Sequence, residues 1–197
     1  MGLFRKTPEG EPLPVTMAGV RLGNRFLAVG VRDPALIAIL AGKTGLTGTA
    51  CAIDADEEAV KAAAAAIEAA GVLADVTRAA WGMWPYDEDS FDVAVVRDLL
   101  PTLTSDDRAR CVSEVLRVLR PGGRALVVEP ARRGGFGALL SGWKGSPSTG
   151  LSRTVGGSRA APTYEGPVRA LKDGGFAAVR LLSEVDGVVY AEGIKKA

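Results

Sequence analysis

Residues 26–34, Phe-Leu-Ala-Val-Gly-Val-Arg-Asp-Pro, restrict the folds open to this chain more than any other stretch. Its apolar part predicts a short buried strand, because apolar runs of about four to eight residues bounded by turn signals are typical of strands. A helix should follow at once, since Asp33 is a good N-cap and Pro34 suits the first helical position. In open α/β sheets, a strand, tight turn and helix in this order mark the place where a nucleotide-like ligand binds.

The rest of the chain alternates strand-like and helix-like segments. Further strands are predicted at 49–53, 72–76, 91–96, 125–128, 176–182 and 185–194, and helices at 35–41, 56–71, 105–119 and 166–172. This alternation implies βαβ units, and therefore a parallel sheet with right-handed crossovers. The last two strands are joined by a tight turn, which favours an antiparallel pair. We expect an α/β fold, a Rossmann-like doubly wound sheet of seven mostly parallel strands with an antiparallel C-terminal hairpin.

Proline, glycine and serine define the predicted domain limits. Residues 1–14 carry three prolines among charged residues and predict a flexible N-terminal lead-in. Residues 15–197 are expected to form a single domain, which suits their length. Within it, residues 131–163 are rich in Gly and Ser and are basic, which predicts an insertion or lid.

Composition excludes several classes of function. Lys and Arg number 24 against 23 Asp and Glu, so the net charge of +1 gives no reason to expect nucleic acid as a partner. Histidine is absent, which removes the commonest general base and metal ligand, and we predict no metal site. Cys51 and Cys111 lie in apolar segments and predict reduced core thiols, hence a cytoplasmic protein. The sequence shows neither a bilayer-spanning apolar run nor a signal peptide.

One basic segment, residues 132–144, carries an apolar stripe. Phe136, Leu139, Leu140 and Trp143 recur at helical spacing beside basic residues. A short amphipathic element of this kind suits a lid, peripheral contact with a membrane surface, or a protein partner's groove. The alternative is a loop that folds its apolar residues back on the domain, which its glycines favour.

Four segments resemble the class I S-adenosylmethionine-dependent methyltransferases, in particular the small-molecule, single-domain branch. They are Asp-Glu-Asp-Ser-Phe-Asp-Val at 87–93, Leu-Arg-Val-Leu-Arg-Pro-Gly-Gly-Arg at 116–124, Val-Val-Glu-Pro at 127–130 and Ala-Leu-Lys-Asp-Gly-Gly-Phe at 170–176. The resemblance extends from about residue 26 to 195. It implies the fold expected above and S-adenosylmethionine as the cofactor.

The resemblance also implies which residues hold the cofactor: Gly30, Val31, Arg32, Asp54, Ala55, Ala80, Trp81 and Arg97. Asp54 matches the acidic residue that accepts hydrogen bonds from the ribose hydroxyls, although a solvated aspartate at a turn is the plain alternative. Trp81 can stack on a purine. Packing within the loop is an equally good interpretation of that tryptophan.

The chain departs from the family pattern in two loops. Ala28 and Ala80 stand where the family has acidic residues, and Arg32 and Pro34 stand where it has glycines. Side chains there hinder close approach of a ligand to bare backbone. The carboxylate of Asp33 would compete with that of the ligand at the helix N-terminus, whereas Arg32 can pair with a ligand carboxylate.

Two functional hypotheses follow. The first is methyl transfer from S-adenosylmethionine to a small-molecule acceptor, with Asp98, Glu129 and Tyr164 as candidate proton acceptors. The second is a non-catalytic methyltransferase-like domain that binds a partner or another ligand. A phosphate-binding loop is excluded, because Gly-Lys-Thr at 42–44 ends a predicted helix and lacks the leading glycine at 37. The nicotinamide dinucleotide fingerprint fails at positions 32 and 35.

Overall fold

The computed structural model of the protein describes residues 10–131 and 165–197. The strands are β1 (Arg25–Val29), β2 (Thr49–Asp54), β3 (Asp75–Arg78), β4 (Phe91–Arg97), β5 (Leu119–Pro130), β6 (Ala177–Val185) and β7 (Val188–Ile194). The helices are α1 (Leu13–Ala18), α2 (Pro34–Thr44), α3 (Glu57–Ala69), α4 (Ser105–Val118) and α5 (Pro167–Asp173), with a 3₁₀ turn η1 (Leu100–Thr102). The predicted amphipathic element at 132–144, and nearly all of the predicted insertion, lie outside the described residues.

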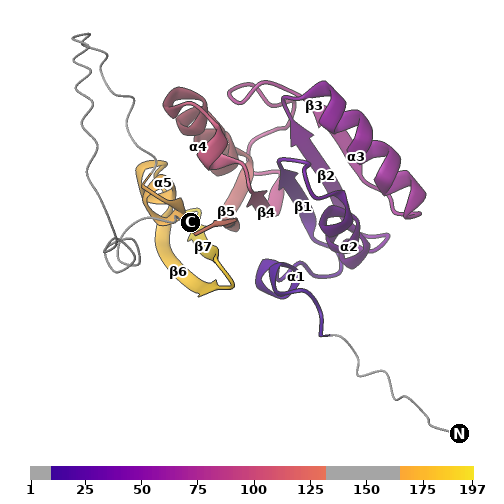
Figure 1. Ribbon diagram of the computed structural model, residues 1–197, viewed down its shortest axis with the longest axis horizontal. Coiled ribbons are helices and arrows are strands. Elements are labelled where there is room, and N and C mark those ends of the chain that lie inside the picture. The colour runs from indigo at the N-terminus through magenta and orange to yellow at the C-terminus, as the bar shows by residue number, and fades with distance from the viewer. Residues whose placement is uncertain (1–9, 132–164) are drawn as a thin grey trace, which may run out of the picture.

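The seven strands form one sheet in the order β3-β2-β1-β4-β5-β7-β6 (Figure 1). Strands β1 to β5 pair in parallel, and β7 runs antiparallel to both β5 and β6. This confirms the predicted architecture. The order proceeds outward from β1 through β2 on one side and from β4 on the other, so the topological switch point of the sheet lies between β1 and β4.

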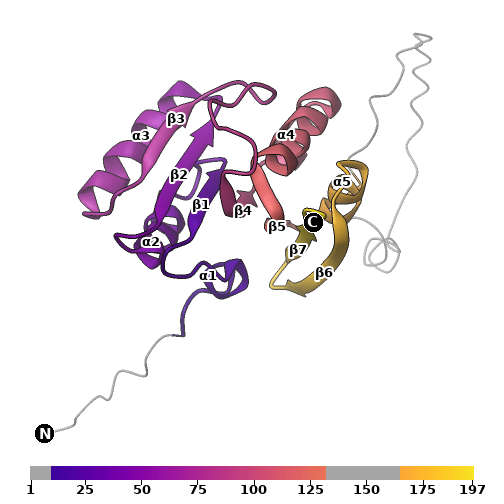
Figure 2. The same cartoon turned by 180° about the vertical axis from the view of Figure 1, so that it is seen from behind.

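Helices cover both faces of the sheet, and the alternation of side chains along β1 shows how. Leu27 and Val29 are fully buried in the core that the sheet forms with α4 and α5. Phe26 and Ala28 point to the other face, which packs against α1, α2 and α3. The views from both sides show α4 and α5 apart from α2 and α3 (Figures 1 and 2).

One predicted local signal folds as expected, and a second is displaced along the chain. The side chain of Asp33 accepts the backbone N–H of Leu36 at 3.0 Å, and Pro34 opens α2, so the Asp-Pro pair does start this helix. The tight turn of the C-terminal hairpin forms, but at Asp186 and Gly187, with positive φ of 51° and 74°, and not at 183–184 between the predicted strands 176–182 and 185–194. Such a two-residue turn matches the twist of the two strands it joins.

Several boundaries differ from prediction, for local reasons. Helix α1 begins inside the predicted lead-in of residues 1–14. Strand β3 starts at Asp75 and not at 72, because Cys51 of β2 pairs with Asp75. The cap of α4 is Thr104 instead of Ser105. Strand β5 begins at Leu119 and not at 125, since a bulge opposite Phe91 and Val93 accommodates the Pro-Gly-Gly run within the strand.

Both cysteines are free thiols in the core, as predicted. Cys51 lies on β2 and Cys111 on α4, and both face the layer formed with α4 and α5. Burial, with the nearby carboxylate of Asp75, raises the pKa of the Cys51 thiol to about 11. Burial likewise raises the pKa of Tyr86 to about 12.

The stability of the folded state is expected to fall as the pH rises from about 9 towards 11. Below the ordinary thiol pKa of 9.0, Cys51 is protonated in both states, whereas between 9.0 and about 11 only the unfolded chain releases this proton. The unfolded state then binds fewer protons and gains stability, by about 1 kcal/mol at pH 10. Urea unfolding at pH 8 and pH 10 should show a smaller alkaline loss in Cys51→Ala than in the wild type. An equal loss in both would contradict this assignment.

Candidate functional site

The candidate site lies at the carboxyl edge of the sheet, where the loops after β1, β2 and β4 meet. Gly30 follows β1 directly, and its N–H donates to the carbonyl of Ile53 on β2 at 2.9 Å. Its φ is +86°, and a Cβ there would lie 3.2 Å from the carbonyl oxygen of Arg97 at the end of β4. Only glycine allows this conformation and this close approach without strain.

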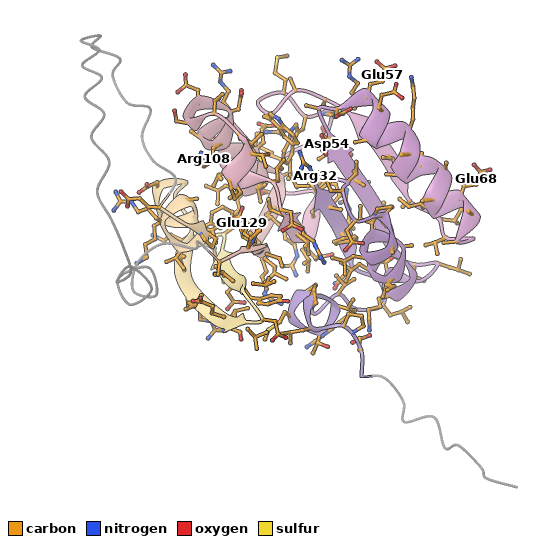
Figure 3. The ribbon with its side chains drawn as sticks, in the orientation of Figure 1. Arg32, Asp54, Glu57, Glu68, Arg108 and Glu129 are labelled. Atoms are coloured by element: carbon orange, nitrogen blue, oxygen red, sulfur yellow. The ribbon has the colours of Figure 1, made fainter. Side chains whose placement is uncertain are left out.

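Asp54, the last residue of β2, is held by two backbone donors. One carboxylate oxygen accepts the N–H of Val31 at 3.1 Å, and the other accepts the N–H of Asp56 at 3.0 Å. The side chain is 5% exposed. Arg32 and Asp54 lie at neighbouring strand ends (Figure 3). Asp54 therefore joins the β1–α2 loop to the start of α3, and fixes the orientation of its own carboxylate.

The loop after β3 is anchored to α4. Glu114 accepts the backbone N–H of Trp84 at 3.0 Å, and Arg117 donates to the carbonyl of Tyr86 at 2.9 Å. The hydrogen bond from Arg117, opposed by partial burial, holds the pKa of Glu114 below its ordinary value. These contacts position Trp81, which is partly buried and packs against the core, as the loop-packing interpretation expects. Ala80 beside it is exposed.

Three charged side chains cluster at the switch point between β1 and β4. The guanidinium of Arg97 forms an ion pair with Asp33 at 3.0 Å and a second with Asp98 at 3.1 Å. Their side chains are 30%, 33% and 40% exposed in that order. Asp98 adopts φ of +50°, a left-handed conformation that aspartate tolerates better than most residues. We call these three residues the switch-point cluster.

Glu129, near the end of β5, is fully buried and accepts the backbone N–H of Leu100 at 3.1 Å. Its carboxylate thus holds the turn that follows β4. Asp98 donates its own N–H to the carbonyl of Val128, so the same turn is tied to β5 from both sides. Glu129 stands beside the end of β5 in Figure 3.

The structure brings the predicted cofactor residues to one edge of the sheet. Gly30, Val31 and Arg32 follow β1, Asp54 and Ala55 end β2, and Arg97 ends β4. Ala80 and Trp81 follow β3, which pairs with β2 at this edge through Asp54 and Arg78. Of the candidate proton acceptors, Asp98 and Glu129 lie at the same edge, and Tyr164 lies outside the described residues.

Space beside Ala28 is scarce. The cavity that Ala28, Gly30, Asp33 and Arg97 line with apolar residues of α2 has a volume of about 10 Å³. This is about what the centre of a single water molecule needs. This void beneath α2 is too small for a ligand, so an amino-acid tail would have to lie outside it, against the exposed parts of Asp33 and Arg97.

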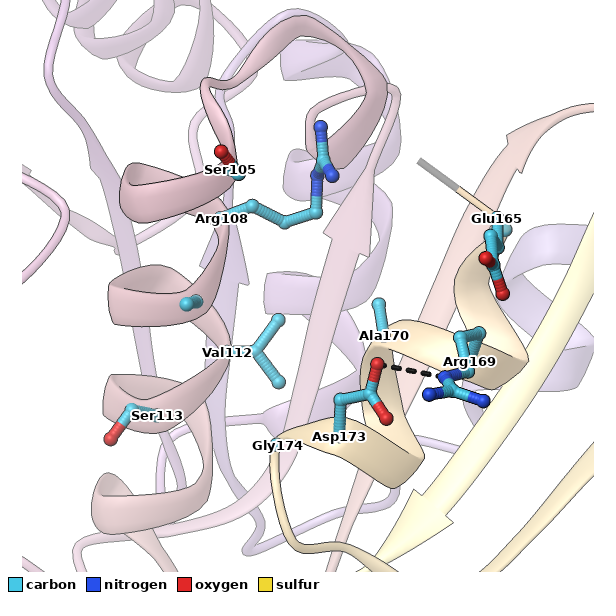
Figure 4. Close-up of a pocket in the computed structure, with 11 residues that line it drawn as sticks. Ser105, Arg108, Val112, Ser113, Glu165, Arg169, Ala170, Asp173 and Gly174 are labelled. Carbon is cyan, nitrogen blue, oxygen red and sulfur yellow. Dashed lines mark hydrogen bonds and ion pairs between the residues drawn. The ribbon is translucent and has the colours of Figure 1, made fainter. Parts of the chain in front are cut away.

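A larger cavity of about 440 Å³ lies between α4 and α5. Arg108 borders it from α4, and the ion pair between Arg169 and Asp173 borders it from α5 at 2.9 Å (Figure 4). Its described lining contains none of the predicted cofactor residues. We therefore assign it no part in cofactor binding.

The sequence around Asp33 predicts a helix cap and a competitor for a ligand carboxylate, but not a partner of Arg97. The two residues are far apart in the sequence. The signal that finds the pair is topological: β1 and β4 are neighbours in a sheet that reverses its order between them, so their following loops meet.

Comparisons with known proteins agree on one family. A family model described as a methyltransferase domain matches residues 27–127, from β1 into β5. The ubiquinone/menaquinone biosynthesis C-methyltransferase UbiE of Pseudomonas putida is 31% identical over 117 residues, which are 58% of this chain and 45% of that protein. The chain spans less than half the length of the curated relatives that it matches first.

Solved structures share the fold. A SAM-dependent methyltransferase from Aquifex aeolicus aligns with a TM-score of 0.67 and 17% identity, over 92% of this chain and 87% of that one. The cyclase SpnF aligns with a TM-score of 0.60 and 22% identity, over 87% of this chain and 56% of that one. At these identities the likeness concerns the fold alone. Since the family model covers half of the chain and the sheet has the architecture expected of the family, this chain belongs to the class I S-adenosylmethionine-dependent methyltransferase family.

Proposed function

We propose that the protein transfers a methyl group from S-adenosylmethionine to a small-molecule acceptor. The observation that carries the proposal is the buried carboxylate of Asp54, fixed beside Gly30 at the carboxyl edge of a methyltransferase domain. Ligands of open α/β sheets bind at this edge, at the switch point. The two unpaired cysteines support a cytoplasmic location.

The nucleoside end of the cofactor suits the residues present. A carboxylate offers about four lone-pair positions, and two of those on Asp54 are taken by backbone N–H groups. Two remain for ribose hydroxyls. The anchored loop with Trp81 supplies an aromatic face near the end of β3, which supports stacking on a purine.

The surface available to the amino-acid end of the cofactor differs from the one that the family pattern implies. Glycines are replaced by Arg32 and Pro34, and the space beside Ala28 is almost filled. The cations that can hold an α-carboxylate there are Arg32 and, in the switch-point cluster, Arg97, and Asp33 is an anion that can hold an α-ammonium group.

The chemistry needed from the protein is modest. When bound, the cofactor supplies an activated methyl group, so the protein has to orient the acceptor, exclude water and accept a proton where the acceptor carries one. Asp98 suits the last role, because its side chain is 40% exposed at the edge of the site. Glu129 is fully buried and bonded to Leu100, which suits positioning of the turn.

The name of the matched relatives, a C-methyltransferase of ubiquinone/menaquinone biosynthesis, supports a small-molecule acceptor. No described helix, in either 10–131 or 165–197, is long and apolar enough to cross a bilayer.

Calorimetry tests the proposal. S-adenosylhomocysteine and S-adenosylmethionine are expected to bind with dissociation constants in the micromolar range, whereas AMP, which lacks the amino-acid end, should bind more weakly. If neither S-adenosylhomocysteine nor S-adenosylmethionine gives a heat of binding at millimolar concentration, the proposal is wrong.

A non-catalytic methyltransferase-like domain is the second candidate, and the ion pair between Asp33 and Arg97 favours it, because it occupies the amino-acid end with protein side chains. The double variant Arg32→Gly/Pro34→Gly discriminates. Binding gained only in this variant supports loss of an ancestral site, while micromolar binding by the wild type ends this alternative.

A further inference from the structure

The switch-point cluster carries an inference that rests on the proposed function and deepens it. Arg97 is the last residue of β4, and its carbonyl oxygen lies against Gly30. Its guanidinium reaches across the switch point to Asp33 on the loop after β1. The ion pair therefore bridges the two strand ends between which a ligand of this fold is held.

The cluster lies next to the nucleoside end of the site. Asp54 accepts the N–H of Val31, which is two residues before Asp33 in the same loop. A ligand whose ribose bonds to Asp54 and whose tail extends past Gly30 meets Arg97 and its two carboxylates. An amino-acid tail carries one carboxylate and one ammonium group, and the cluster holds one cation and two anions.

The carboxylate of Asp33 is the same chemical group as the carboxylate of such a tail. Both are suited to the planar guanidinium fork of Arg97. The side chains of Arg97 and Asp33 are each about one third exposed. Ion pairs with this much exposure are weak, so a ligand carboxylate can replace the carboxylate of Asp33. Once released, Asp33 still caps α2 through its other oxygen, which accepts the N–H of Leu36.

We infer that Arg97 is the receptor for the carboxylate of the cofactor, and that Asp33 is a built-in competitor which the cofactor displaces. The displaced Asp33 then faces the ammonium group. Ligands that end in a carboxylate exchange one ion pair for another, whereas nucleosides without an amino-acid tail leave the pair between Asp33 and Arg97 in place.

Two substitutions separate these roles. Asp33→Asn removes the competing charge and keeps a side-chain oxygen for the cap, because asparagine caps helices as well as aspartate does. It should tighten binding of S-adenosylhomocysteine by about two- to fivefold, the worth of an exposed ion pair. Arg97→Gln should weaken it by about tenfold or more, the worth of a charged hydrogen bond. Methylthioadenosine, which has the nucleoside and sulfur but no amino-acid end, should bind all variants within about twofold.

Glu11→Gln is the matched control for the lost charge. Glu11 pairs with Lys43 at the other end of α2 at 2.5 Å, with similar exposure. This variant should change neither the affinity for S-adenosylhomocysteine nor the affinity for methylthioadenosine. Arg32→Gln tests the other cation of the loop, which is exposed and has no ion pair among the described residues. Arg97→Lys, which keeps the charge, should recover part of the lost affinity, and binding of methylthioadenosine reports that each variant is folded.

The outcomes are distinct. Unchanged or weaker binding of S-adenosylhomocysteine in Asp33→Asn overturns the inference. So does an affinity for S-adenosylhomocysteine that falls in Arg32→Gln but not in Arg97→Gln. The inference also fails if a variant changes the affinity for methylthioadenosine as much as the affinity for S-adenosylhomocysteine. If the wild type binds S-adenosylhomocysteine while any of these occurs, the proposed function stands and only the inference fails. If neither the wild type nor Asp33→Asn binds any of the ligands, both fail. Binding of S-adenosylhomocysteine that arises only in Asp33→Asn also overturns the inference, because the cofactor then fails to displace Asp33 in the wild type.

Discussion

An Asp54→Ala variant is expected to lose measurable binding of S-adenosylhomocysteine and to unfold more easily by about 2–4 kcal/mol. The substitution leaves the N–H groups of Val31 and Asp56 without their acceptor at a buried position. It also removes the acceptor proposed for the ribose hydroxyls, whose charged hydrogen bonds are together worth at least about a hundredfold in affinity. Titration calorimetry and urea unfolding measure the two effects separately.

Asp56→Asn is the matched control for this variant. Asp56 lies two residues further on and caps α3 by accepting the N–H groups of Glu58 and Ala59. Because asparagine caps equally well, neither stability nor affinity should change by more than a small margin. Wild-type affinity in a folded Asp54→Ala protein would show that this carboxylate does not bind the nucleoside.

Glu192→Leu is expected to destabilise the protein by about 3 kcal/mol or more, because breaking a buried ion pair leaves its partner charge uncompensated. Glu192 on β7 is 4% exposed and accepts Arg124 of β5 at 2.7 Å and Arg180 of β6. Arg124 also donates to the carbonyl oxygens of Met17 and Ala18. One carboxylate thus connects three strands and, through Arg124, the end of α1.

The control for Glu192→Leu is Arg180→Gln. The side chain of Arg180 is 70% exposed, so its loss should cost less than about 1 kcal/mol. Urea unfolding of both variants at neutral pH decides the matter. Equal losses in the two variants would show that the contact between Glu192 and Arg124 adds nothing beyond the contact with Arg180.

Much of the fold could be predicted from sequence because local signals agreed with each other. The Asp-Pro pair at 33–34 specifies the start of the helix after β1, and the alternation of strand-like and helix-like segments specifies the parallel sheet. Prediction failed where pairing decided the outcome. No local sequence signal shows that β3 pairs with β2 from Asp75 and not from Val72. Likewise, no local signal shows that Pro121 and the two glycines after it continue β5 past a bulge.

The candidate site divides in the same way. Asp54 is identified from sequence through the family resemblance, which implies an acidic residue at the end of the second strand, and the structure adds that its carboxylate is fixed by two N–H groups. The ion pair between Asp33 and Arg97 depends on strands that are adjacent in space and distant in the chain. Its existence follows from the sheet order, which no single stretch of sequence contains.

The place of β7 has a consequence for biosynthesis. This strand lies between β5 and β6, although it follows both of them in the chain. The parallel strands can associate while the chain is still being made, but the outer side of β5 keeps unpaired backbone groups until β7 emerges from the ribosome. The nascent protein therefore carries an open strand edge during synthesis, the kind of surface on which chains join wrongly and which chaperones protect.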